Sequence, residues 1–248
     1  MRRPTPASFN LLVALLATSA ITSCSRRNES ALLPKPTAFG AAIVESSGGM
    51  QTAQTGAILP QPVVVQVNDE HGNALAGALV QFAAAPGVTF DSPYGLTDSS
   101  GQVTTSVTLG GMAGHYQIVA FTFDKTHKRV KLKIEEIALC YQQALGRHLA
   151  IQYCERCHNP ESSVERVSNY DNLEVKPHPF TEGETFNKIS DADLSAVISY
   201  GGPALNKSPL MPAWGNTLSR SDIQALISYV RAVSEPPSRD AGPVYAKD

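Results

Sequence analysis

Short runs of alternating hydrophobic and polar residues fill the first half of the chain, from about residue 60 to residue 134. The runs are rich in β-branched residues, and glycine, asparagine and aspartate separate them, which is typical of strands joined by tight turns. This pattern predicts an antiparallel β-sandwich over residues 47–137. The predicted strands cover 63–67, 78–82, 88–90, 103–109, 116–123 and 130–134.

The period of the hydrophobic pattern changes from two to about four in the second half. Leu145, Leu149 and Tyr153 recur at intervals of four and place one apolar stripe on a first helix. Ser190 and Ser219 are predicted to cap two later helices, because each is followed three positions on by an aspartate. The second half therefore predicts a small all-α domain.

The length of 248 residues suits two domains, a sandwich at 47–137 and a helical domain at 141–234. Residues 25–46 are small and polar with two prolines, which predicts a flexible tether. Residues 235–248 are predicted to form a loose C-terminal tail.

The first 24 residues have the features of an export signal. Two arginines precede a short apolar run at 11–21, too short to span a membrane. The segment Ile21-Thr22-Ser23-Cys24 resembles the bacterial lipobox, which implies that Cys24 is lipidated. An ordinary cleaved signal peptide is the alternative. Because Ser25 is not a retention signal of the aspartate type, the outer membrane is favoured.

Net charge and cysteine use narrow the class of protein further. A net charge of −2 with 17% charged residues gives no basic field for nucleic acid. Of the four cysteines, Cys140 has no evident chemical use. Cys140 is either a small buried side chain or one half of an intermolecular disulfide.

The motif Cys154-Glu155-Arg156-Cys157-His158 carries the candidate chemistry. Two thiols at this spacing form thioethers to the haem vinyl groups, and the adjoining imidazole becomes an axial ligand of the iron. A redox dithiol would need no following histidine, and a zinc site would need two further ligands. The motif therefore predicts one covalently attached haem c.

The second axial ligand decides between electron transfer and gas or peroxide chemistry. Met211, the sole methionine of the helical half, lies between prolines in Ser208-Pro209-Leu210-Met211-Pro212, which would stiffen the loop that holds its sulfur. His148 and His178 are the competing ligands. We predict that Met211 is the second axial ligand.

Residues 141–234 resemble a class I monohaem cytochrome c. The resemblance rests on Gly146, the haem motif, the segment Leu194–Gly202, the Met211-Pro212-x-Trp214-Gly215 loop and the segment Leu226–Val230. It implies that Gly146 contacts Tyr229 where the first and last helices cross, and that Trp214 packs beside the haem.

Two positions depart from that family's pattern. Ala150 stands where many members carry an aromatic residue. The proline whose carbonyl orients the proximal histidine is also not evident, and Pro160 and Pro177 are both candidates.

Residues 47–137 resemble the bacterial immunoglobulin-like repeats of the invasin and intimin adhesins. The resemblance rests on Asp69-x-x-Gly72-Asn73-x-Leu75-x-Gly77-x-x-Val80-x-Phe82 and on Thr97-Asp98-x-x-Gly101. Three histidines in this stretch show no metal-ligand spacing and are predicted to be surface or turn residues: His71, His115 and His127.

The sequence as a whole predicts a lipid-anchored, exported electron carrier rather than an enzyme. Its expected partners are redox proteins of the periplasm or membrane, with the sandwich as spacer or docking module. The alternatives are an electron-transfer subunit of a larger dehydrogenase or oxidase, and a haem-based gas sensor or peroxidase if Met211 does not bind iron.

Overall fold

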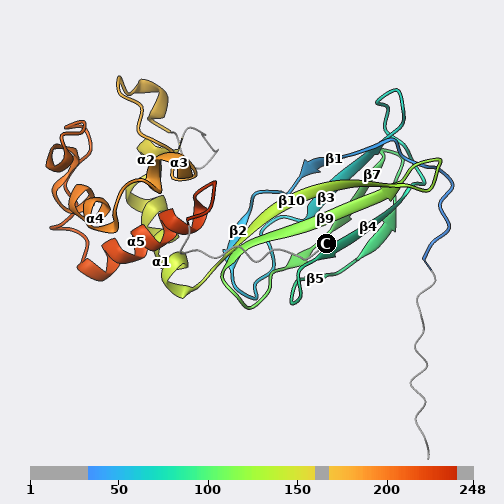
Figure 1. Ribbon diagram of the computed structural model, residues 1–248, viewed down its shortest axis with the longest axis horizontal. Coiled ribbons are helices and arrows are strands. Elements are labelled where there is room, and N and C mark those ends of the chain that lie inside the picture. Colours follow the sequence, from blue (N-terminus) through green and yellow to red (C-terminus); the bar gives the residue numbers. More distant parts are fainter. Residues whose placement is uncertain (1–32, 160–167, 239–248) are drawn as a thin grey trace, which may run out of the picture. The chain divides into compact units, whose positions relative to one another are not determined.

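The computed structural model describes residues 33–159 and 168–238. Strands come first along the chain and helices follow (Figure 1). The strands are β1 (Ala42–Ser47), β2 (Thr52–Gln54), β3 (Val63–Asn68), β4 (Leu79–Ala84), β5 (Thr89–Phe90), β6 (Tyr94–Leu96), β7 (Gln102–Thr105), β8 (Val107–Thr108), β9 (Gly114–Phe123) and β10 (Arg129–Leu139). The helices are α1 (Tyr141–Tyr153), α2 (Glu155–His158), α3 (Gly183–Phe186), α4 (Asp191–Tyr200) and α5 (Arg220–Val233), with 3-10 turns η1 (Tyr170–Asn172) and η2 (Gly202–Leu205).

The strands form a β-sandwich. One sheet has the order β2-β10-β9-β4-β6, a second has the order β1-β3-β7, and β5 and β8 form a small ribbon. The long pair β9 and β10 is antiparallel over ten residue pairs, from Arg129 opposite Phe123 to Ala138 opposite Gly114. All other strand pairs are also antiparallel except β2 with β10. The predicted sandwich is therefore confirmed.

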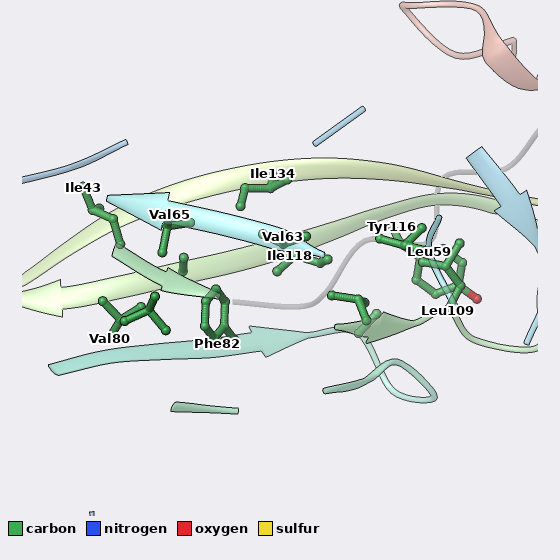
Figure 2. Packing of buried hydrophobic residues seen from close by; sticks show 14 of the residues in the cluster. Ile43, Leu59, Val63, Val65, Val80, Phe82, Leu109, Tyr116, Ile118 and Ile134 are labelled. Carbon is green, nitrogen blue, oxygen red and sulfur yellow. The ribbon is translucent and has the colours of Figure 1, made fainter. Parts of the chain in front are cut away.

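Strand alternation builds the sandwich core. In β3 the side chains of Val63, Val65 and Val67 are fully buried, whereas the residues between them are half-buried. This is the period-two pattern of a strand with one face on the core. Figure 2 shows side chains from both sheets meeting in this cluster, among them Val65 of β3 and Phe82 of β4.

The predicted tether is too long at its C-terminal end. Residues 42–46 belong to β1, which pairs antiparallel with β3, and Ile43 is buried in the core. A six-residue strand with one buried side chain has too weak a local pattern to be recognised without its partner strand. The signal segment, including Cys24, lies outside the described residues.

The first part of the predicted tail is also ordered. The Glu235 amide donates to the Thr181 carbonyl at 2.8 Å, and the Gly183 amide donates to the Glu235 carbonyl at 3.0 Å. Ser238 is buried. The prediction of a loose segment is therefore wrong for 235–238, because this segment pairs with a turn more than 50 residues earlier. Residues 239–248 lie outside the described part.

The helical half is organised around the crossing of α1 and α5. The predicted caps are confirmed: the Ser190 side chain accepts from the Asp193 amide, and the Ser219 side chain accepts from the Asp222 amide. These bonds satisfy amides that a helix leaves unpaired at its first turn. Among the described residues no helix is long and apolar enough to cross a membrane.

The prediction of surface or turn histidines is wrong for His115. Its side chain is buried on β9, and Nε2 lies 2.7 Å from the carbonyl oxygen of Ala232 near the end of α5. Because a carbonyl oxygen only accepts, Nε2 donates this bond. A buried carbonyl needs such a donor, which explains a histidine inside an otherwise apolar surface. His71 and His127 are exposed.

Candidate functional site: a thiol, thiol and imidazole on one turn

The motif residues follow directly on α1. Cys154 lies between α1 and α2, and its amide still donates to the Ala150 carbonyl at 2.8 Å. The amides of Cys157 and His158 both donate to the Cys154 carbonyl at 3.0 Å. One helical turn thus presents two free thiols and an imidazole, all three of them half-buried.

The Cys154 thiol has the wrong chemistry for thiol–disulfide exchange. Burial raises its pKa to about 12, and the nearby Glu155 and Cys157 act in the same direction. Reactive dithiols depend on a lowered thiol pKa, because the thiolate is the nucleophile. Within 33–159 and 168–238, no three His, Cys, Asp or Glu side chains gather in a metal-binding group. The raised pKa of Cys154 weighs against the redox interpretation.

His158 is oriented by a hydrogen bond on its far nitrogen. Its Nδ1 lies 2.9 Å from the carbonyl oxygen of His178, to which it donates. Pro177, one candidate for this role, is therefore not the acceptor, and Pro160 lies outside the described residues. The sequence pattern could not separate the carbonyls of neighbouring residues in one loop.

The bond to His178 also fixes the tautomer of His158. Burial lowers the pKa of His158, and the bond to His178 acts against that shift. The neutral imidazole then carries its proton on Nδ1 and its lone pair on Nε2. This is the arrangement in which a histidine binds a metal through Nε2, with a second group holding the other nitrogen.

Phe180 is a site residue that the sequence did not indicate. Its ring stacks on the imidazole of His158 with 4.8 Å between centroids and 16° between planes. Phe186 and Tyr229 support Phe180 from the side, with centroid distances of 5.8 and 6.4 Å. The only sequence signal was an aromatic residue beside Pro179, which is too common to be specific.

His148 and His178 are the two histidines that compete with Met211 for the role of second ligand. The His178 backbone holds His158 from its Nδ1 side, and the His178 side chain pairs with Glu182 at 2.9 Å. His148 is exposed on α1. The contacts of His178 thus lie with His158 and Glu182.

The loop that carries Met211 is closed against the end of α4. The Gly202 amide donates to the Met211 carbonyl at 3.0 Å. A Cβ on Gly202 would lie 1.9 Å from the Ser208 carbonyl oxygen, so a side chain at this position would prevent the closure. Gly201, with φ of +82°, occupies the region that favours glycine. Met211 itself is half-buried.

Trp214 connects this loop to the helix that leads into the motif. Its amide donates to the Ile198 carbonyl at 2.9 Å, which holds the loop on α4. Its ring lies 5.2 Å from the ring of Tyr153, the last residue of α1 and the neighbour of Cys154. The fold thus brings the Met211 loop towards the motif although 53 residues separate Met211 from His158.

Comparison with protein families identifies the helical half. Residues 142–230 match the family model described as cytochrome c oxidase, cbb3-type, subunit III. These residues form a cytochrome c domain. The cytochrome c domain contains α1, the motif, the Met211 loop and most of α5. A cytochrome c domain suggests haem-based electron transfer.

The residues present fit such a group. Haem c needs two thiols and an imidazole on one short segment, and the turn at 154–158 supplies them. The imidazole also needs a free Nε2, and the bond from Nδ1 to His178 leaves that nitrogen available. Aromatic side chains lie near both parts of the site, Phe180 against His158 and Trp214 against Tyr153.

The β-sandwich resembles adhesin domains. The D00-D0 domain of intimin is 15% identical, covering 43% of this chain and 50% of that chain at a TM-score of 0.32. The D0-D1 domain of intimin is 17% identical, covering 43% and 51% at 0.33. The adhesin InvE of Yersinia pseudotuberculosis is 15% identical, covering 42% and 33% at 0.30. The chain thus spans about half the length of the intimin fragments. No curated protein sequence matches this chain.

Proposed function

We propose that this protein is an exported monohaem c-type cytochrome, anchored to a bacterial membrane by a lipid on Cys24. It carries single electrons to or from redox proteins of the periplasm or membrane. The hydrogen bond from His158 Nδ1 to the His178 carbonyl carries the proposal, because it prepares Nε2 to bind iron. The membrane anchor rests on the lipobox-like segment before Cys24.

The residues have separate tasks in this function. Cys154 and Cys157 would hold one haem c covalently, His158 would bind iron through Nε2, and Met211 would bind it through its sulfur. When bound, haem c supplies a one-electron couple between ferrous and ferric iron. The chain holds the ligands in place and limits water, and Trp214 packs next to the motif helix.

An optical spectrum of the oxidised protein with its Met211→Ala variant tests the ligand set. The weak absorption band at the red end that accompanies methionine ligation should be present in the wild type and absent from the variant. The haem should stay with the polypeptide in acidified organic solvent, since two thioethers hold it. A colourless protein, or a haem that is extracted, would contradict the proposal.

The family match favours one second candidate function. The description of the matched family names a subunit of an oxidase. By analogy, this chain could serve as the electron-transfer subunit of a larger dehydrogenase or oxidase. In that case the sandwich would be the binding module rather than a spacer. A stoichiometric partner that co-purifies with the tagged full chain from detergent-solubilised membranes supports this candidate. A free, singly migrating cytochrome supports the carrier.

A further inference from the structure

His178 joins the axial histidine to a carboxylate. Its carbonyl accepts from His158 Nδ1, and its own side-chain Nδ1 lies 2.9 Å from Oε2 of Glu182. The backbone of His178 thus contacts the His158 imidazole, and its side chain pairs with the carboxylate of Glu182. Any motion of the His178 side chain that displaces its backbone also changes the bond to His158.

Glu182 is itself held in place. Its Oε1 accepts from the Thr185 hydroxyl at 2.5 Å, and its amide donates to the Pro179 carbonyl at 2.9 Å. The bonds to Thr185 and His178 lower the pKa of Glu182, so this side chain is a carboxylate at neutral pH. Hydrogen bonds to an ionised acceptor are stronger than neutral ones. The turn from 178 to 182 is therefore closed by side-chain bonds as well as by its backbone.

The far end of the same turn is fixed by the chain after α5. The Glu235 amide donates to the Thr181 carbonyl, and the Gly183 amide donates to the Glu235 carbonyl. These backbone bonds hold residues 181–183, whereas the His178–Glu182 pair holds the end that contacts His158. Pro179 restricts His178 to extended backbone, which limits the directions in which its carbonyl can point.

Resting on the haem site proposed above, we propose that Glu182 is a positioning residue that sets the reduction potential through His178. The carboxylate holds His178 so that its carbonyl accepts from His158 Nδ1. An acceptor on that nitrogen makes the imidazole a stronger electron donor to the metal, which stabilises ferric iron. Loss of the Glu182 contact should weaken the acceptor and shift the reduction potential upward.

Loss of the Glu182 charge would shift the reduction potential even without any change at His178. The choice of variants separates this charge effect from the loss of the contact with His178. Glu182→Ala removes both charge and contact, whereas Glu182→Gln removes the charge but keeps an oxygen that can accept from His178. Glu184→Gln is the matched control, because Glu184 is an exposed carboxylate two residues further along. His178→Ala breaks the same pair from the other side and leaves the backbone carbonyl in place.

The test is a spectroscopic redox titration of the full-length holoprotein and these four variants. We expect an upward shift of the potential in Glu182→Ala and His178→Ala, and smaller, equal shifts in Glu182→Gln and Glu184→Gln. Combining Glu182→Ala with His178→Ala should add nothing to either, since both act through one contact. Equal potentials in Glu182→Ala and Glu184→Gln would overturn the proposal, as would a large shift in Glu182→Gln.

A second measurement follows the hydrogen bond itself. In proton NMR spectra the His158 Nδ1–H should exchange with solvent faster in Glu182→Ala than in wild type and in Glu184→Gln. If Glu182→Ala does not fold, His178→Ala decides, and an unchanged potential and exchange rate there would overturn the proposal. Failure of the proposed function differs in kind, because the wild-type protein would then carry no haem to titrate.

Discussion

Gly146 of α1 and Ala225 of α5 meet with their backbones in contact. A Cβ on Gly146 would lie 1.9 Å from the Ala225 carbonyl oxygen and 2.8 Å from Cβ of Tyr229. The contact between Gly146 and Tyr229 that the family resemblance implied is thereby confirmed. Since α1 ends next to Cys154, this crossing fixes where the motif begins relative to α5.

Gly146→Ala should therefore destabilise the cytochrome c domain. The added methyl group has no room, and either helix must shift, at a cost of about 1–3 kcal/mol or more. Chemical denaturation of the holoprotein, followed by the haem absorbance, measures this loss. Gly111→Ala is the control, because a Cβ there meets nothing within 4 Å. Equal denaturation midpoints for the two variants would contradict the expectation.

Arg231 holds the segment between α3 and α4 against α5. Its guanidinium donates to the carbonyls of Phe186 and Ile189 and to Asp191. Arg231→Met leaves two carbonyls without these donors and should lower the free energy of unfolding by roughly 2–4 kcal/mol. Asp191→Asn, at a side chain 68% exposed, should change it by about 1 kcal/mol or less. Thermal unfolding of both variants checks the order, and a larger loss in Asp191→Asn would refute it.

Because Glu136 is a buried titratable residue, we expect the stability of the sandwich to depend on pH. Its side chain is fully buried, Oε2 accepts from the Gln51 amide at 2.8 Å, and Oε1 has no hydrogen-bond partner among the described residues. Burial raises the pKa of Glu136 to about 8, with a smaller contribution from Glu45 in the same direction. A raised pKa means that the folded state holds the proton more tightly than the unfolded state.

The stabilisation from this proton is complete below pH 4.5, the ordinary value, and is lost as the pH rises towards 8. The free energy of unfolding should fall by at most about 1.4 kcal/mol per pH unit across that window. Denaturant titrations at several pH values measure the slope. Glu136→Gln keeps an acceptor for Gln51 and cannot ionise, so its slope should be flatter. An identical slope in the variant would show that another group is responsible.

Lipid anchoring is tested at Cys24. Cys24→Ser cannot form the thioether to a diacylglycerol, so the protein should move from the membrane fraction to the soluble fraction. Metabolic labelling with a radioactive fatty acid should be lost in parallel. Cys140→Ser is the matched control and should keep both the label and the membrane location. An unlabelled wild type would leave simple secretion as the explanation, and a labelled Cys24→Ser protein would mean that the lipid is attached to another residue.

The sequence by itself determined those features whose causes are local. Alternating residues in β3 predicted a strand, and the Ser190 and Ser219 caps lie at the expected positions because capping depends on three neighbouring residues. The spacing of Cys154, Cys157 and His158 likewise predicted one covalently attached haem c from five neighbouring residues. These inferences needed no knowledge of how distant segments meet.

Only the tertiary structure decided the contacts between distant segments. The acceptor for His158 is 20 residues away, and Phe180 and Glu182 acquire their roles only because that loop folds back onto α2. His115 was expected at the surface or in a turn because the three histidines of the sandwich show no metal-ligand spacing, yet its side chain bonds to the distant Ala232 carbonyl. Such pairings depend on which polar groups folding removes from water, and that is a property of the packed chain rather than of any short segment.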